Sequence, residues 1–187
     1  MTLKPPDIVI LLKMVAQGRE PWSYNQLAYE LGMSASEVHA GVKRAVQVGL
    51  MQVEEGWGYP DVDALAEFLV HGVRYAFAPE RGGMVQGVPT AYSAAPLKGQ
   101  VDLADELPTV WPEEGGPVRG LEFSPLYRSV PLAAQRDPGL YELLVLVDAL
   151  RVSHAGRELA VSELYKRLPQ APSKRGSHGK ESQLHRR

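Results

Sequence analysis

The chain has 187 residues, of which 44% are apolar, so it is long enough for one medium-sized domain or two small ones with a sizeable core. Its formal net charge is −2, whereas a protein that binds nucleic acid usually carries excess positive charge. The sequence contains no Cys, which excludes disulfides, thiol-based sensing and thiolate metal ligands.

The distribution of charge is more informative than its sum. Residues 1–99 hold 8 Lys and Arg against 10 Asp and Glu, residues 100–168 hold 7 against 11, and residues 169–187 hold 5 against 1. Contacts to DNA phosphates must therefore come from individual basic side chains or from the basic tail. The candidate side chains are Arg19, Lys43, Arg44, Arg74 and Arg81.

The N-terminal residues predict a scaffold helix in a cytoplasmic protein. The start of the chain lacks the basic and long apolar regions of a secretory signal, and no apolar run reaches the roughly 18 residues of a membrane span, so we expect no membrane contact. Pro5 and Pro6 suit the first turn of a helix that Gly18 ends. Its apolar face should pack across the helices that follow.

Residues 23–31 predict a second, short helix. Leu27, Ala28 and Leu31 are spaced three and four residues apart, which places them on one helical face. Ser23 or Asn25 can cap its start, and Gly32 can adopt the left-handed conformation that ends a helix.

A third helix is predicted from Ser34 onward. Ser34 and Glu37 have the spacing of a reciprocal capping box, in which each side chain bonds to the backbone N–H of the other residue. At 100° per residue, Val38 and Val42 fall on the side that faces the core. The opposite side carries small, polar and basic residues that can enter a major groove and bond to bases or phosphates: Ser36, His39, Ala40, Lys43, Arg44 and Gln47.

The stretch LAYELGMSASEVHAGVKRAVQVGL, residues 27–50, resembles the helix-turn-helix of bacterial winged-helix transcriptional regulators. The resemblance covers about the first fifty residues and implies a DNA-binding domain over residues 1–92. We expect its DNA contacts to come from Ser34 and the six residues just named, together with Arg81. The alternative for this stretch is a plain helical hairpin that binds protein or has no ligand.

A short strand at 50–53 and a loop at 54–60 are expected next, in the place where a wing would start, but this segment is short and acidic. A helix over 61–72 follows. Asp61 and Asp63 at its start suit the helix dipole and do not call for a metal ion.

The alternation of residues 73–77 predicts a strand that pairs with residues 85–92 around a bend at 79–83. We interpret this pair as a displaced wing whose Arg81 enters a minor groove; a plain exposed turn Arg fits the same pattern. The glycines at 82–87 lack both a following helix and the Lys-Ser/Thr pair of a nucleotide-binding loop.

Residues 93–136 are rich in Pro and Gly yet too apolar for a free linker, so we expect an ordered, extended segment. Residues 137–168 predict C-terminal helices, the first with apolar residues on more than one side. A second copy could cover that surplus, which makes this region the expected site of dimerisation. Residues 169–187 should be a flexible basic tail.

These patterns predict a mainly α, α+β protein with a small β-hairpin. We expect a sequence-specific, homodimeric transcription regulator that binds double-stranded DNA. A protein-interaction adaptor or antitoxin-like partner, using the Pro-rich segment and the C-terminal helix, is the alternative. The five scattered His show no catalytic or metal-binding spacing, so neither an enzyme nor a cofactor nor a metal is expected.

Overall fold

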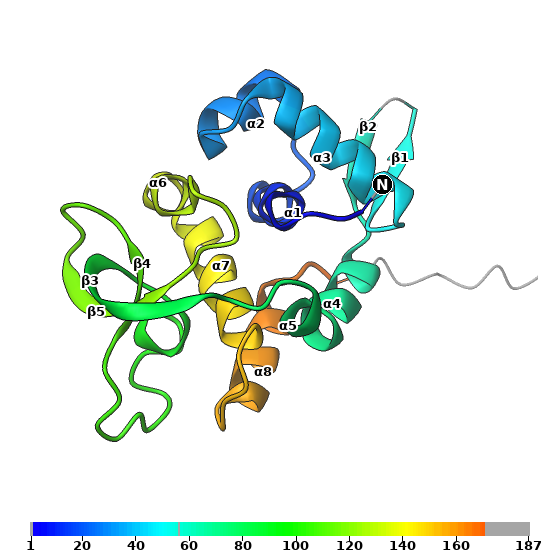
Figure 1. The fold of residues 1–187 in the computed structure, drawn as a ribbon. Helices are drawn as coiled ribbons and strands as arrows, with labels where there is room; N and C mark the ends of the chain where they lie inside the picture. The colour runs from blue at the N-terminus through cyan, green and yellow to red at the C-terminus, as the bar shows by residue number, and fades with distance from the viewer. Residues whose placement is uncertain (1, 56, 171–187) are drawn as a thin grey trace, which may run out of the picture.

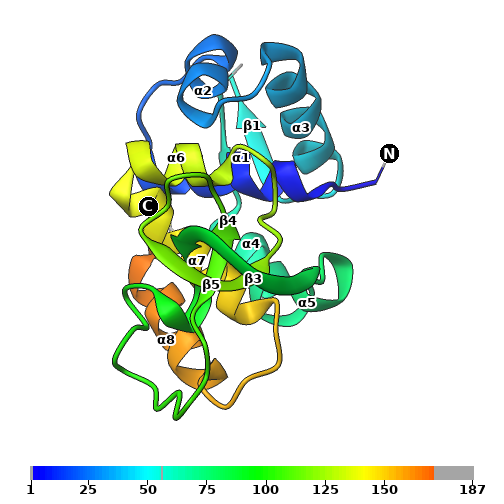
Figure 2. The ribbon, with the colours of Figure 1, turned by 60° about the vertical axis from the view of Figure 1, so that its left-hand side comes forward.

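The structure is a computed structural model that describes residues 2–55 and 57–170. It combines helices with a β1–β2 sheet and a small closed sheet of β3, β4 and β5 (Figures 1 and 2), which confirms the mixed α and β composition. The elements run in the order α1 (Pro5–Gln17), α2 (Tyr24–Leu31), α3 (Ala35–Gln47), β1 (Met51–Glu54), β2 (Trp57–Pro60), α4 (Val62–His71), α5 (Val73–Ala76), β3 (Arg81–Pro89), the 3-10 turn η1 (Ala91–Ser93), β4 (Thr109–Pro112), β5 (Val118–Phe123), α6 (Val130–Arg136), α7 (Pro138–Leu150) and α8 (Arg157–Arg167).

Helix α1 lies in the middle of the molecule, between the α2–α3 pair and α7. It was predicted to bury one face, but residues 6–15 are all buried because it is covered on both sides. The one Lys among them, Lys13, is stabilised by Asp137 at 2.7 Å and Glu30 at 3.3 Å. A single apolar core therefore joins the N-terminal helices to the C-terminal ones.

The residues after α3 form an antiparallel hairpin of β1 and β2, in which Met51 pairs with Pro60 and Glu54 with Trp57. The strand predicted at 50–53 is confirmed. The loop predicted at 54–60 is wrong, because the chain turns back at once and pairs with that strand. The hairpin thus occupies the position directly after α3.

The strand predicted at 73–77 is also wrong. Residues 73–76 form the single helical turn α5, in which the N–H groups of Tyr75 and Ala76 donate to the Gly72 carbonyl at 3.1 Å. Val73 and Phe77 lie four residues apart, so a helical turn places both on one side just as a strand would. There Val73 is fully buried and the Phe77 ring meets Phe68 edge-on at 5.9 Å.

The Pro- and Gly-rich segment supplies β4, β5 and α6 to the chain's own fold. The prediction that it is extended throughout is wrong, because residues 130–136 form the helix α6. Strand β3 is antiparallel to both β4 and β5, which are parallel to each other. A side chain at Gly87 would collide with the backbone of Trp111, so the strands can cross this closely only because that residue is glycine. Trp111 on β4 and Phe123 on β5 are fully buried, and Trp111 lies against Tyr141 of α7, with 5.6 Å between the ring centroids.

A buried polar network fastens this sheet to α7. One oxygen of the Asp148 carboxylate accepts from Thr90 Oγ1 and Trp111 Nε1, each at 2.7 Å, and the other accepts from Arg151 at 2.8 Å. Burial raises the pKa of Asp148, and these three donors oppose that effect. Arg151 also donates to the carbonyls of Phe77 and Ser124, so the charges are buried with partners on all sides.

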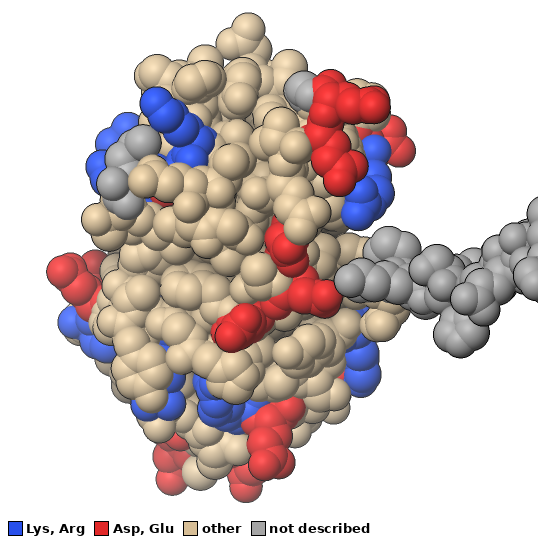
Figure 3. Space-filling model, turned by 90° about the vertical axis from the view of Figure 1, so that its right-hand side faces the viewer, with Lys and Arg blue, Asp and Glu red and all other residues tan. Residues whose placement is uncertain are grey.

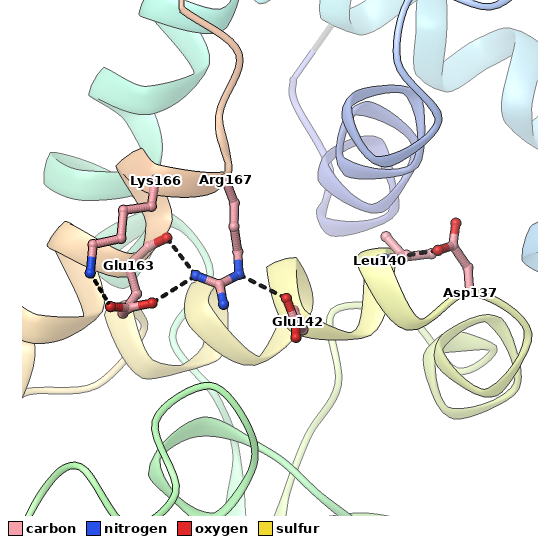
Figure 4. Close-up of polar contacts among 6 residues, drawn as sticks. All are labelled: Asp137, Leu140, Glu142, Glu163, Lys166 and Arg167. Atoms are coloured by element: carbon pink, nitrogen blue, oxygen red, sulfur yellow. Dashed lines mark hydrogen bonds and ion pairs between the residues drawn. The ribbon is translucent and has the colours of Figure 1, made fainter.

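Helix α7 contacts α1, α4, α5, α6 and α8, so its own chain covers it. Its residues 143–150 are all buried. The apolar surplus that predicted a dimer interface on this helix is therefore covered within one chain, so it no longer indicates dimerisation through α7. Arg167 of α8 bonds to Glu142 at 2.8 Å and to Glu163 at 2.7 Å, which ties α8 to α7 (Figure 4).

No helix among the described residues combines the length and the apolar character needed to cross a bilayer. Residues 171–187 of the predicted basic tail (169–187) lie outside the described residues.

Candidate nucleic-acid interface

Helices α2 and α3 are joined by a tight turn whose geometry follows from capping. Ser23 Oγ accepts from the Gln26 N–H at 3.1 Å, which fixes the start of α2. Gly32 ends that helix with φ 65° and ψ 34°, the predicted left-handed conformation. Ser34 Oγ then accepts from the Glu37 N–H at 3.1 Å and starts α3. The two predicted helices and the tight turn between them are thus present over residues 24–47.

Glu37 does not bond back to Ser34 as the predicted capping box requires. Its Oε2 accepts instead from the Tyr127 hydroxyl at 2.6 Å, a residue ninety positions along the chain. Burial and this hydrogen bond to a carboxylate both raise the pKa of Tyr127, which keeps its phenol protonated as the donor. The start of α3 is thus held by the segment before α6.

Helix α3 presents a polar stripe on the side away from the core. Val38, Val42 and Ala45 are buried, as the helical wheel predicts. The opposite side exposes Ser36, His39, Lys43 and Gln47, with the small, half-buried Ala40 between them. Ser34 is exposed just before the first turn, with its Oγ 3.1 Å from Ser36 Oγ. We call Ser36, His39, Ala40, Lys43 and Gln47 the α3 stripe.

Arg44 is the one predicted contact residue on α3 that does not face solvent. It is 9% exposed and pairs with Asp7, which is fully buried. Arg44 Nε donates to Asp7 Oδ2 and Nη2 donates to Oδ1, each at 2.8 Å. The hydrogen bond with Asp7 raises the pKa of Arg44. The prediction that Arg44 projects toward DNA is wrong because a partner on α1 draws this flanking side chain inward.

Arg81 is also far from the α3 stripe. It begins β3, where it is exposed and its guanidinium lies 5.2 Å from the Phe123 ring. The hairpin predicted to present it does not form, since β3 pairs with β4 and β5 instead. In both ribbon views α3 and β3 lie on opposite sides of α1 (Figures 1 and 2).

Aromatic residues that the sequence reasoning gave no functional role line one side of the stripe. The Tyr24 ring lies 4.9 Å from the His39 ring and 5.4 Å from the Trp22 ring, and Trp22 Nε1 donates to the Gly58 carbonyl at 2.8 Å. Tyr24 is 37% exposed. Tyr24 directly follows Ser23, the residue that caps α2, and this position is the sequence signal that could have predicted a role beside the stripe.

The β1–β2 hairpin itself is acidic at its tip, where Glu54 and Glu55 are exposed. Behind the tip, Arg19 lies over the Tyr59 ring at 4.5 Å and lines a cleft of about 300 Å³ with Gln52 and Trp57. The face that carries the hairpin and α4 is mostly uncharged, with separate groups of acidic and of basic side chains (Figure 3). This hairpin is poorly suited to gripping phosphate.

A further polar cluster contains His154 and Tyr92. His154 stacks on Tyr92 at 3.9 Å between ring centroids and accepts from the Gly156 N–H at 2.9 Å. Burial raises the pKa of Tyr92 to about 12, which disfavours its phenolate as a nucleophile. Within residues 2–55 and 57–170, no three His, Asp or Glu side chains are grouped so that they could hold a metal ion.

Comparison of the chain with protein-family models, with curated proteins and with solved structures gave no match. Its own residues therefore carry the functional proposal.

Proposed function

We propose that this chain is a sequence-specific DNA-binding transcription regulator of the winged helix-turn-helix kind, acting as a homodimer in a bacterial cytoplasm. The observation that carries the proposal is the α3 stripe: a capped helix, fixed to the core by Val38 and Val42, exposes a row of small and polar side chains. Such a row can enter a major groove without steric hindrance.

Each residue type on the stripe suits a different contact. Gln47 can form two hydrogen bonds with an adenine edge, and Lys43 can bond to a guanine edge or a phosphate. Ser36 and His39 can bond to bases or to the backbone. The helix is held at its start by Ser34 and Tyr127 and at its side by Arg44, so these groups would be presented on a rigid element.

The scarcity of cations favours a homodimer. With Arg44 paired internally, the stripe offers Lys43 as its only permanent cation, so one copy would bind weakly. Two copies with their α3 helices about 34 Å apart would combine two half-sites into one binding event.

The alternative of a protein-interaction adaptor drew on the Pro-rich segment and the C-terminal helix. Much of the apolar surface of both lies in the chain's own core, including Trp111, Phe123 and residues 143–150 of α7. No specific feature favours that alternative over the exposed stripe.

The test is selection of duplexes from a random-sequence library with the purified full chain, followed by fluorescence anisotropy on the recovered sequence. Lys43→Ala should weaken binding by about 1–3 kcal/mol per half-site, roughly 5- to 150-fold. Lys98→Ala removes the same charge from an exposed loop position away from α3 and should leave the affinity unchanged. Selection that enriches no sequence would overturn the proposal.

A further inference from the structure

Residues 127–136, which lead into and include α6, contact α2, α3 and the turn between them at several points. Tyr127 donates to Glu37 at the start of α3, and Arg136 Nη1 donates to the Tyr29 carbonyl of α2 at 2.6 Å. A Cβ added at Gly32 would lie 3.1 Å from Leu132 Cδ2 and 3.2 Å from Ser129 Cβ, so these side chains lie directly against the turn. This segment is a fixed neighbour of α3.

Arg128 is held on this neighbour as an exposed positive charge. Its guanidinium lies over the Tyr127 ring, 5.1 Å from the centroid, and the same Tyr127 is hydrogen-bonded to α3. Within the described part of the chain, neither Arg128 nor Lys43 forms an ion pair. Both charges are therefore available to an anionic partner.

The α3 stripe has two different flanks. His39 and Glu37 are two residues apart and so lie about 160° apart around the helix. His39 touches Tyr24, which leads through Trp22 to the hairpin, whereas Glu37 touches Tyr127, which leads to Arg128. We call these sides the hairpin flank and the Arg128 flank.

A helix that lies in a major groove has a sugar–phosphate backbone along each of its sides. On the hairpin flank the exposed charges at the tip are the carboxylates of Glu54 and Glu55, which repel phosphate. On the Arg128 flank the exposed charge is a guanidinium, whose planar donors match phosphate oxygens.

We propose that Arg128 binds a DNA phosphate beside the groove that α3 reads, so that the segment before α6 does the work that the acidic hairpin cannot do. This inference rests on the proposed function. Because the contact is to the backbone, it should strengthen binding to every sequence alike and should not change which sequence is preferred.

The experiment measures binding of the full chain to two duplexes, one recovered by selection and one of scrambled sequence, over roughly 50 to 200 mM salt. Arg128→Ala should weaken binding to both duplexes by the same factor and reduce the slope of log Kd against log salt concentration by about 0.9 for each Arg128 lost. Arg128→Lys should restore most of the slope. Arg119→Ala removes the same charge from an exposed position on β5 and should behave as the wild type.

The outcomes separate the two proposals. If the wild type binds the selected duplex and Arg128→Ala keeps its salt slope, the role of Arg128 is overturned and the proposed function stands. If the wild type binds neither duplex, both are overturned. Thermal unfolding followed by circular dichroism should show the same midpoint for Arg128→Ala and Arg119→Ala, which excludes unfolding as the cause of a reduced slope.

Discussion

The carboxylate of Asp7 forms hydrogen bonds at the start of α1 and with α3. It accepts from the Lys4 N–H at 2.8 Å, which closes the start of α1, and from both donors of Arg44 on α3. Gly41 makes this possible, since a Cβ there would lie 2.9 Å from Asp7 Oδ1 and 2.5 Å from Ile10 Cδ1. The ion pair therefore sets how closely the proposed reading helix packs against the core.

Arg44→Ala should lower the free energy of unfolding by about 3–5 kcal/mol, because it leaves the buried Asp7 carboxylate without its charged partner. Urea denaturation followed by circular dichroism measures this change. Lys43→Ala, on the neighbouring exposed position, should stay within about 0.5 kcal/mol of the wild type. Equal stability of the two variants would contradict the assignment of Arg44 to the core.

At the scale of an element, Asp137 determines where α7 begins and what it touches. Its Oδ1 accepts from the Leu140 N–H at 3.1 Å, as Figure 4 shows, and its Oδ2 accepts from Lys13 Nζ on α1 at 2.7 Å. Burial acts to raise the pKa of Asp137, but the Lys13 side chain and the N–H groups of Leu140 and Gly139 together outweigh it and lower that pKa below its ordinary value.

The lowered pKa predicts a stability contribution that depends on pH. Since the ionised carboxylate is favoured in the folded state, the contribution is fully present above the unfolded-state value of about 3.9 and is lost as the pH falls through the lower folded-state value. Urea titrations from pH 7 downward should show Asp137→Asn less stable than the wild type at neutral pH, with the gap closing below about pH 4. A gap that widens in acid would contradict this sign.

For the whole molecule, α7 is the helix that α1, α4, α5, α6 and α8 all contact. Leu144 is 1% exposed and Val147 is fully buried. Asp148 on the same helix connects through Thr90 and Trp111 to the sheet. A homodimer, which remains a prediction, therefore needs an interface on some other part of the surface.

Leu144→Glu and Val147→Glu should unfold the protein instead of splitting a dimer, because each buries a carboxylate with no partner. Circular dichroism should show loss of helix and light scattering should show an expanded or aggregated species. Leu107→Glu, at a loop residue that is 52% exposed, is the matched control and should fold normally. A compact, folded monomer of either α7 variant would contradict the central position of this helix.

The sequence by itself determined the features whose causes lie within a few residues. Ser23 and Ser34 each bond to an N–H three residues ahead, and Gly32 adopts its conformation because it lacks a Cβ, so the ends of α2 and α3 follow from local chemistry. The apolar spacing of α1, α3 and α7 likewise predicted helices.

Only the tertiary structure decided what depends on partners far along the chain. Arg44 lies at the edge of a helical face, and its orientation was set by Asp7, 37 residues earlier. The pattern of residues 73–77 fits a strand and a helical turn equally well, and the helical turn is the one in which Phe77 packs against Phe68. Helix α7 has apolar residues on more than one side, and its periodicity does not tell whether its own chain or a second copy covers them. That depends on which distant elements fold against the helix.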